Sequence, residues 1–216
     1  MPLSSDDIQR RLGKVTGCRI ADVMARSKDR KSYGVTRAAY MAELICERLT
    51  GIHIEGFDSS SMQWGREVEE EAIRAFELWV GEPVIPGYFV DHPTIPMAGA
   101  TPDAFVGEFD LAEFKCPKQG THMATLKGAN LDGGYFKQGQ WQLACLGQRK
   151  SVYHVSFDPR WPPSMRLAVK RVWRDEAVIS ELEAEAIKFL RELDTELAAL
   201  RQAYEPGALM EALKAS

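Results

Sequence analysis

The sequence lacks the segments that would place it in or across a membrane, and it lacks the cysteine spacing of a structural zinc site. Its 216 residues contain no run of about 18 apolar residues and no secretory signal at the N-terminus. The four cysteines stand far apart without a CxxC pair, which disfavours zinc and favours reduced thiols in a cytoplasmic protein. No internal repeat or low-complexity segment is present, and the length fits one large domain.

An excess of positive charge is also missing, because the net charge is −4. That value argues against a nucleic-acid partner until the distribution of charge is considered. Residues 1–37 carry nine Lys and Arg against four acids, whereas residues 174–216 carry five basic and ten acidic residues. This distribution allows a local phosphate-binding patch on an acidic protein, although two solvated helices would also produce it.

Apolar periodicity and turn residues predict a mixed α/β fold in which helices flank one central sheet. The expected helices cover residues 4–12, 16–25, 36–50, 62–80, 135–146 and 175–203. The expected strands cover residues 84–85, 88–90, 104–108, 111–115, 152–157 and 167–173.

The most informative stretch is a Thr-Pro-Asp turn ending at Asp103, followed ten residues later by Glu113-Phe114-Lys115. Side chains alternate along a strand, so Glu113 and Lys115 share one face and Phe114 points to the other. Two carboxylates and an ammonium in a low-dielectric place are costly, and such clusters are typical of a hard divalent cation beside an activated water. We therefore expect Asp103 and Glu113 to bind Mg²⁺ or Mn²⁺, and Lys115 to orient or help deprotonate the attacking water. A solvated Glu–Lys pair on a surface hairpin is the alternative.

Two predicted helices carry further candidates. Glu69 lies on the apolar side of the helix over residues 62–80, between Phe76 and Val80 on the helical wheel, where an acid needs a partner or an ion. Gln138 lies on the helix over residues 135–146, where an amide could position water or phosphate without adding charge. Its face is shared, at spacings of three, four and seven, by Trp141, Gln142 and Cys145. An ordinary polar helix surface would give the same pattern.

A series of motifs stands in a fixed order over roughly residues 10–175: Arg11-Leu12-Gly13-Lys14-Val15-Thr16, Tyr40-Met41-Ala42-Glu43-Leu44, Trp64-Gly65-Arg66-Glu67-Val68-Glu69, Thr101-Pro102-Asp103, Glu113-Phe114-Lys115-Cys116-Pro117, Tyr135-Phe136-Lys137-Gln138-Gly139-Gln140, and Tyr153 with Asp158-Pro159-Arg160. In this order they resemble the phage lambda exonuclease family, the YqaJ-type alkaline exonucleases of the PD-(D/E)xK nuclease superfamily. The ordered set is far more specific than the acid and lysine pattern alone.

The resemblance implies a single exonuclease domain over residues 1–216 with a restriction-endonuclease-like core. It implies a Mg²⁺-dependent enzyme that digests one strand of duplex DNA processively from its 5′ end and leaves a 3′ overhang. It further implies a homotrimeric ring, a single-strand annealing recombinase as partner, and a place in the cytoplasm of a bacterial host of a phage or prophage.

Family positions also imply residue roles. Asp103 and Glu113 would be metal ligands, the Phe114 carbonyl a third, Glu69 the helix-borne acid, Lys115 the catalytic lysine and Gln138 the glutamine near it. The implied binding site for the 5′-phosphate consists of Arg11, Cys18 and Thr101, with Thr121 or His122 standing where the family has a further arginine. Met62 would be the wedge that separates the strands.

Two other classes of function remain open from the sequence. One is an endonuclease of the same superfamily, and the other is a non-catalytic DNA-binding scaffold. A scaffold has no need to keep Asp103, Glu113 and Lys115 together.

Overall fold

The computed structural model describes residues 5–54 and 60–204 of the chain. Its main sheet has five strands in the order β2-β5-β6-β7-β8. These are β2 Ile85–Pro86, β5 Ala104–Val106, β6 Asp110–Lys115, β7 Ser151–Phe157 and β8 Leu167–Trp173. Neighbouring strands are antiparallel except β6 and β7, which are parallel, so the sheet is mixed as expected.

A second, smaller sheet corrects the expectation of one central sheet. It has three strands in the order β1-β4-β3, which are β1 Val15–Thr16, β4 Ala98–Ala100 and β3 Val90–Asp91. Strands of two or three residues are too short to show alternation in a sequence. The expected helix over residues 16–25 is likewise replaced by β1, a 3₁₀ turn over Gly17–Arg19 and the short helix α2, Ile20–Val23.

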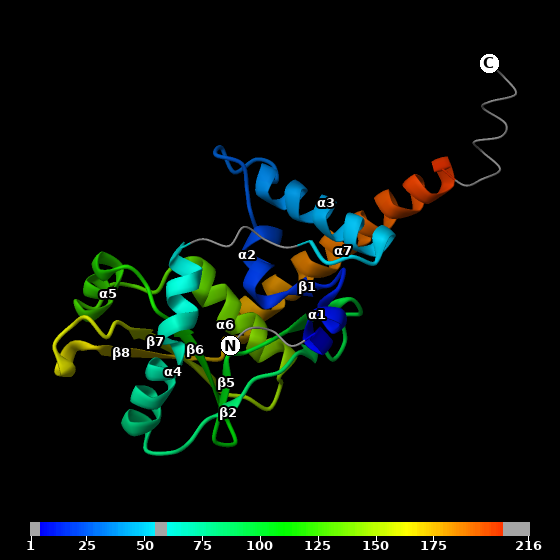
Figure 1. Ribbon diagram of the computed structural model, residues 1–216. Helices are drawn as coiled ribbons and strands as arrows, with labels where there is room; N and C mark the ends of the chain where they lie inside the picture. Colours follow the sequence, from blue (N-terminus) through cyan, green and yellow to red (C-terminus); the bar gives the residue numbers. More distant parts are fainter. Residues whose placement is uncertain (1–4, 55–59, 205–216) are drawn as a thin grey trace, which may run out of the picture.

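The remaining helices are α1 Ser5–Arg11, α3 Val35–Thr50, α4 Ser60–Val80, α5 Gln119–Leu126, α6 Gly133–Cys145 and α7 Glu176–Tyr204. Among them, α4 packs on one face of the main sheet and α6 on the other, whereas α3 lies away from that sheet (Figure 1). None of the helices in the described part of the chain is long and apolar enough to cross a bilayer. The Met62 side chain, predicted as the strand wedge, lies outside the described residues.

The alternation of β6 sends its side chains into two different layers. Ala112 and Phe114 pack with Phe76 of α4 in one apolar cluster, and the rings of Phe76 and Phe114 meet edge to face at 5.6 Å. Leu111 packs on the opposite face with residues of α6 and α7, and Glu113 hydrogen-bonds to α6 on that face. The predicted separation of Phe114 from Glu113 is therefore confirmed.

A third apolar cluster joins the small sheet to the helices. Trp141 of α6, Tyr40 of α3 and Phe189 of α7 are among its buried members, and the Tyr40 and Phe189 rings stack at 5.7 Å. The indole nitrogen of Trp141 donates to the Gly99 carbonyl of β4 at 3.0 Å. Helix α6 is thus fixed between the two sheets, which determines where its polar side chains point.

Candidate active site

The Glu113 carboxylate is fully buried at the centre of the candidate site. Its Oε2 accepts hydrogen bonds from Lys115 Nζ at 3.0 Å and from Gln138 Nε2 at 2.7 Å. Its Oε1 accepts a hydrogen bond from Gln142 Nε2. Three donors therefore hold this carboxylate in one orientation, as a buried charge requires.

Two turns of α6 supply the amide donors. Asp132 caps the helix by accepting the Gly134 N–H at 2.8 Å, and residues four apart then lie on the same face. Gln138 was expected at the centre. Gln142 also reaches it and is fully buried, whereas the sequence indicates only that it shares a helix face with Gln138. Its Oε1 is buried without a hydrogen-bond partner among the described residues.

Asp103 is held by backbone contacts on both sides. Its Oδ2 accepts the N–H of Phe114 at 2.7 Å, which ties the turn to β6. Its carbonyl accepts the N–H of Gly87 at 3.0 Å. A Cβ on Gly87 would stand 1.8 Å from the Pro102 carbonyl oxygen, so only glycine fits where these two backbone segments meet.

Charge and burial act together on these groups. Burial, followed by the negative charge of Glu113, raises the pKa of Asp103 from 3.8 to about 6. Burial alone would lower the pKa of Lys115, but the charges of Glu113 and Asp103 outweigh it and raise that pKa. Two carboxylates that repel each other in a buried place form a site with a strong preference for cations.

The donor set fits a hard divalent cation. Within residues 5–54 and 60–204, no three His, Cys, Asp or Glu side chains cluster in a way that could hold a metal ion by themselves. Mg²⁺ does not need such a cluster, because it is usually bound through one or two carboxylates, water and substrate phosphate. Asp103 and Glu113 offer two carboxylates of this kind, and the Phe114 carbonyl follows Glu113 directly on β6.

A cavity of about 350 Å³ opens beside this centre. The structure brings Arg11, Cys18, Thr101 and Glu69 together in its wall. The same cavity is also lined by Asp103, Lys115 and Gln138. Arg11 donates from Nη1 to Thr101 Oγ1 at 3.5 Å and from Nη2 to Cys18 Sγ at 3.4 Å. The three residues expected to bind a terminal phosphate therefore form one group beside the carboxylates.

His122 does not join this group, which corrects the expectation for it. The side chain belongs to α5 and is fully buried. Its Nε2 donates to the Met165 carbonyl at 2.8 Å, so its Nδ1 accepts from Ser156 Oγ at 2.8 Å. With both ring nitrogens engaged inside the protein, His122 is not available to a phosphate.

A mixed sheet that presents two carboxylates and a lysine at the end of β6 defines a restriction-endonuclease-like core of the PD-(D/E)xK type. The model of the YqaJ-like viral recombinase domain matches residues 8–149. The chain therefore belongs to the family of YqaJ-like viral recombinase domains, as its motifs predicted.

Solved structures agree with this assignment. The alkaline exonuclease LHK-Exo from Laribacter hongkongensis and LHK-Exo in complex with dAMP are each 39% identical to this chain. Each match covers 99% of this chain and 100% of the other, with TM-scores of 0.84 and 0.85. A phage-related exonuclease from Haemophilus somnus 129PT shares 19% identity over 85% of this chain and 96% of its own, with a TM-score of 0.63, and supports the fold alone. No curated protein matches the chain.

Proposed function

We propose that this chain is a Mg²⁺-dependent exonuclease that digests one strand of linear duplex DNA from its 5′ end and leaves a 3′ overhang. Family membership and the matched LHK-Exo structures support a DNA exonuclease. The observation that carries the 5′ polarity is the position of Arg11, in the same cavity as Asp103, Glu69 and Lys115.

Asp103 and Glu113 are the proposed ligands of the ion, with the Phe114 carbonyl as a third and Glu69 in the same cavity. Mn²⁺ is expected to replace Mg²⁺, because both prefer oxygen ligands. The chemistry that such an ion supplies when bound is polarisation of the phosphate and a lower pKa of a coordinated water. Lys115 carries the positive charge that faces the developing charge on the phosphate and orients the attacking water. Gln138 and Gln142 keep Glu113 in place.

Arg11 is the proposed receptor of the 5′-phosphate. A guanidinium fork suits a terminal phosphate dianion, and the Thr101 hydroxyl adds a second donor. Cys18 contributes a weaker donor. The contacts that now link Arg11 to Thr101 and Cys18 would be exchanged for contacts to the phosphate.

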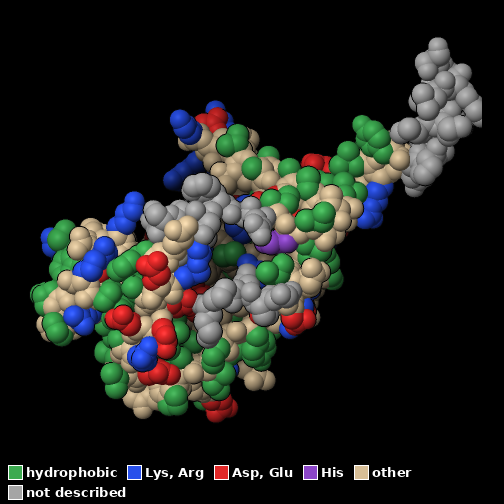
Figure 2. Space-filling view, viewed as in Figure 1, with side chains coloured by type: hydrophobic (Ala, Val, Ile, Leu, Met, Phe, Trp, Pro, Cys, Tyr) green, Lys and Arg blue, Asp and Glu red, His purple; other side chains and the backbone are tan. Residues whose placement is uncertain are grey.

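The duplex is expected to lie against the basic N-terminal part of the chain. Arg26, Lys28, Arg30 and Lys31 are exposed on the projecting loop next to α3, and Figure 2 shows Lys and Arg side chains gathered there. Such contacts bind the backbone without regard to sequence, as processive movement requires. We further propose that three copies close into a ring around the DNA through a heterologous interface, and that a single-strand annealing recombinase receives the overhang.

Linear duplex labelled at one 5′ end tests the proposal. With Mg²⁺ the label is expected to leave as a mononucleotide, with EDTA it should stay, and a 5′-hydroxyl end should be cut more slowly than a 5′-phosphate end. Lys115→Ala is expected to bind the duplex without cutting it, and Arg11→Ala to lose the preference for the phosphate. Release from the 3′ end, or normal turnover by Lys115→Ala, would contradict the assignment.

A further inference from the structure

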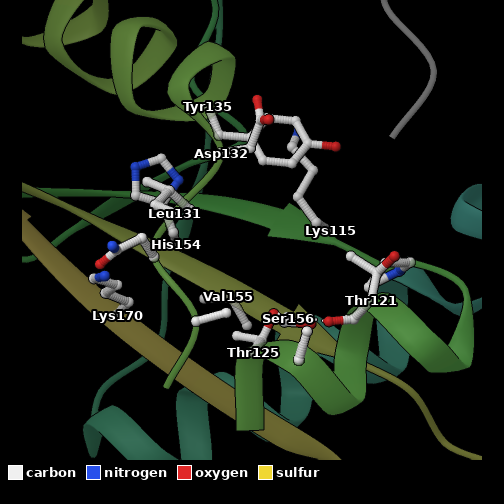
Figure 3. Close-up of a pocket in the computed structure, with 14 residues that line it drawn as sticks. Lys115, Thr121, Thr125, Leu131, Asp132, Tyr135, His154, Val155, Ser156 and Lys170 are labelled. Atoms are coloured by element: carbon white, nitrogen blue, oxygen red, sulfur yellow. Dashed lines mark hydrogen bonds between the residues drawn. The ribbon is translucent and has the colours of Figure 1, made fainter. Parts of the chain in front are cut away.

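A second cavity, of about 250 Å³, shares Lys115 with the first cavity but none of its other lining residues, Arg11 included. Residues of β7, β8, α5 and the segment leading into α6 form its wall. Figure 3 shows Lys115 and Tyr135 together at one side of this cavity, Lys170 at another, and Thr125 of α5 below. Lys115 lines both cavities, so the proposed hydrolytic centre is the partition between them.

The composition of the wall matches a flat aromatic ligand. The Tyr135 ring lies 5.4 Å from the Lys115 ammonium, and Leu131 and Val155 add apolar surface. Thr125 and Asn130 bring hydrogen-bonding groups to the same wall. The volume is just below the range of about 300 to 1,000 Å³ that is usual for drug-sized ligands, which suits one small planar group.

The charges of the wall indicate a ligand with phosphates. Lys115 and Lys170 bring two ammonium groups to the cavity, against the single carboxylate of Asp132. His154 is buried, and neither of its ring nitrogens has a hydrogen-bond partner among the described residues. A nucleotide within a strand has a base for the apolar wall and a phosphate on each side for the lysines.

We propose that this cavity receives the base of the second nucleotide, the one directly 3′ of the bond that is cut, stacked on Tyr135. The inference rests on the proposed function. If the 5′-terminal phosphate binds at Arg11 and the scissile phosphate lies at Lys115, the second nucleotide comes next to Lys115, and this cavity is the one that meets the first at Lys115. Stacking accepts every base, so the site would tolerate any sequence.

This placement requires the second base to leave its pair before each cut. Removing that base should therefore remove a favourable contact made with the enzyme. The test uses duplexes with a 5′-phosphate and one abasic site, placed at the first, second or sixth nucleotide of the strand that is cut. An abasic site at the second nucleotide is expected to lower kcat/KM for the first cut roughly ten-fold, the effect typical of one lost base–aromatic stack. The site at the sixth nucleotide should not affect that cut.

Two substitutions on the same helix make the test specific. Thr125→Tyr places a ring inside the cavity and is expected to slow cutting of the intact duplex and to abolish the effect of the abasic site. Met123→Tyr is the matched control, because Met123 is 41% exposed on α5 and does not line the cavity. It should behave as the unchanged protein does. Tyr135→Leu keeps an apolar side chain without a ring. It should cut the intact duplex and the duplex abasic at the second nucleotide at similar rates.

Equal rates on the intact duplex and on the duplex abasic at the second nucleotide would overturn the inference, as would sensitivity confined to the first nucleotide. The inference would also be overturned if Thr125→Tyr still cut the duplex abasic at the second nucleotide as much more slowly than the intact duplex as the unchanged protein does. If any of the three substituted proteins fails to fold by circular dichroism, the rates of the unchanged protein on the duplexes with abasic sites still decide. The intact duplex distinguishes failure of this inference from failure of the proposed function. If the unchanged protein does not release the 5′ label from the intact duplex, the proposed function itself is refuted.

Discussion

The Glu113 carboxylate shows how much of this site depends on single side chains. Its three donors come from two elements, Lys115 on its own strand and Gln138 and Gln142 on α6. A carboxylate held in this way keeps its orientation before an ion or a substrate arrives. The order of the site is thus built into the protein.

Replacing Gln142 with leucine should weaken the site without removing a proposed ligand. Oε1 of Glu113 would lose its donor inside the protein, and loss of such supporting contacts typically costs about 10- to 100-fold in metal affinity or activity. Titration of activity with Mg²⁺ should show a higher requirement for the ion, with DNA binding kept. Gln148→Leu, at an exposed position, is the control, and an unchanged Mg²⁺ requirement in Gln142→Leu would contradict the role.

Asp103 should destabilise the metal-free protein at alkaline pH. Because its pKa rises from 3.8 to about 6 on folding, the folded state favours the protonated form, and this contribution to stability is lost as the pH rises through about 6. Asp103→Asn keeps an oxygen for the Phe114 N–H and removes the charge. In EDTA at pH 8 it should raise the free energy of unfolding by roughly 1 to 2 kcal/mol, allowing for partial exposure of the group.

The measurement is a pair of thermal melts in EDTA. The stabilising effect of Asp103→Asn should shrink between pH 8 and pH 4, where the carboxyl group of the unchanged protein is protonated as well. A gain that stays constant across this range would show that neither the burial of the Asp103 charge nor its repulsion by Glu113 is the cause. Activity should be lost at every pH, since a proposed ligand is gone.

At this scale the sequence predicted one set of positions well and another poorly. Glu113 and Lys115 could be predicted because alternation along a strand places them on one face, and Asp103 because the antiparallel pairing of β5 with β6 brings the turn before β5 beside Glu113. His122 could not, because neighbouring helical residues point about 100° apart. Thr121 lines the second cavity, whereas His122 turns into the core, and without α5 in the prediction the two could not be told apart.

Among the elements, α6 has the most functions. It directs Gln138 and Gln142 at Glu113, packs Trp141 into the core, and lies against β7 at Gly139. A Cβ on Gly139 would stand 2.9 Å from His154 Nε2 and 3.6 Å from Val152 Cγ2. The close approach of helix and strand therefore depends on the missing side chain.

Two glycine substitutions should have opposite effects on stability. Gly139→Ala pushes α6 away from β7 and is expected to lower the free energy of unfolding by roughly 1 to 3 kcal/mol, as overpacking does. Gly120→Ala in α5 meets nothing within 4 Å and should raise it by up to about 1 kcal/mol through helix propensity. Urea denaturation of both variants measures the difference. A stabilised Gly139→Ala would show that the His154 side chain moves aside from the added methyl group at little cost.

The long helices and the strands of the main sheet follow from periodicity, and their observed ends lie within about two residues of those expected. The elements that the sequence did not predict are short. Helix α5 has a polar sequence without an apolar stripe, and β1 and β4 have two and three residues. Their positions depend on tertiary partners such as the Trp141 contact with Gly99, which no local pattern contains.

For the whole molecule, the central expectation is dependence on a free DNA end. The proposed ring of three subunits could load only where a strand ends, so covalently closed plasmid should resist digestion while the same plasmid, linearised, is consumed. Light scattering after size exclusion should give a mass of three chains. Nicking or linearisation of the closed circle would instead favour an endonuclease of the same core.

The contact at Gly87 has a consequence for genetic variation. Position 87 carries no side chain and no chemistry, yet any larger residue there would displace the Pro102 carbonyl and with it the turn that holds Asp103. In a deep mutational scan selected for DNA digestion, position 87 should tolerate as few substitutions as the proposed metal ligands do. A survey that ranks residues only by mutational intolerance would thus count a piece of backbone among the catalytic groups.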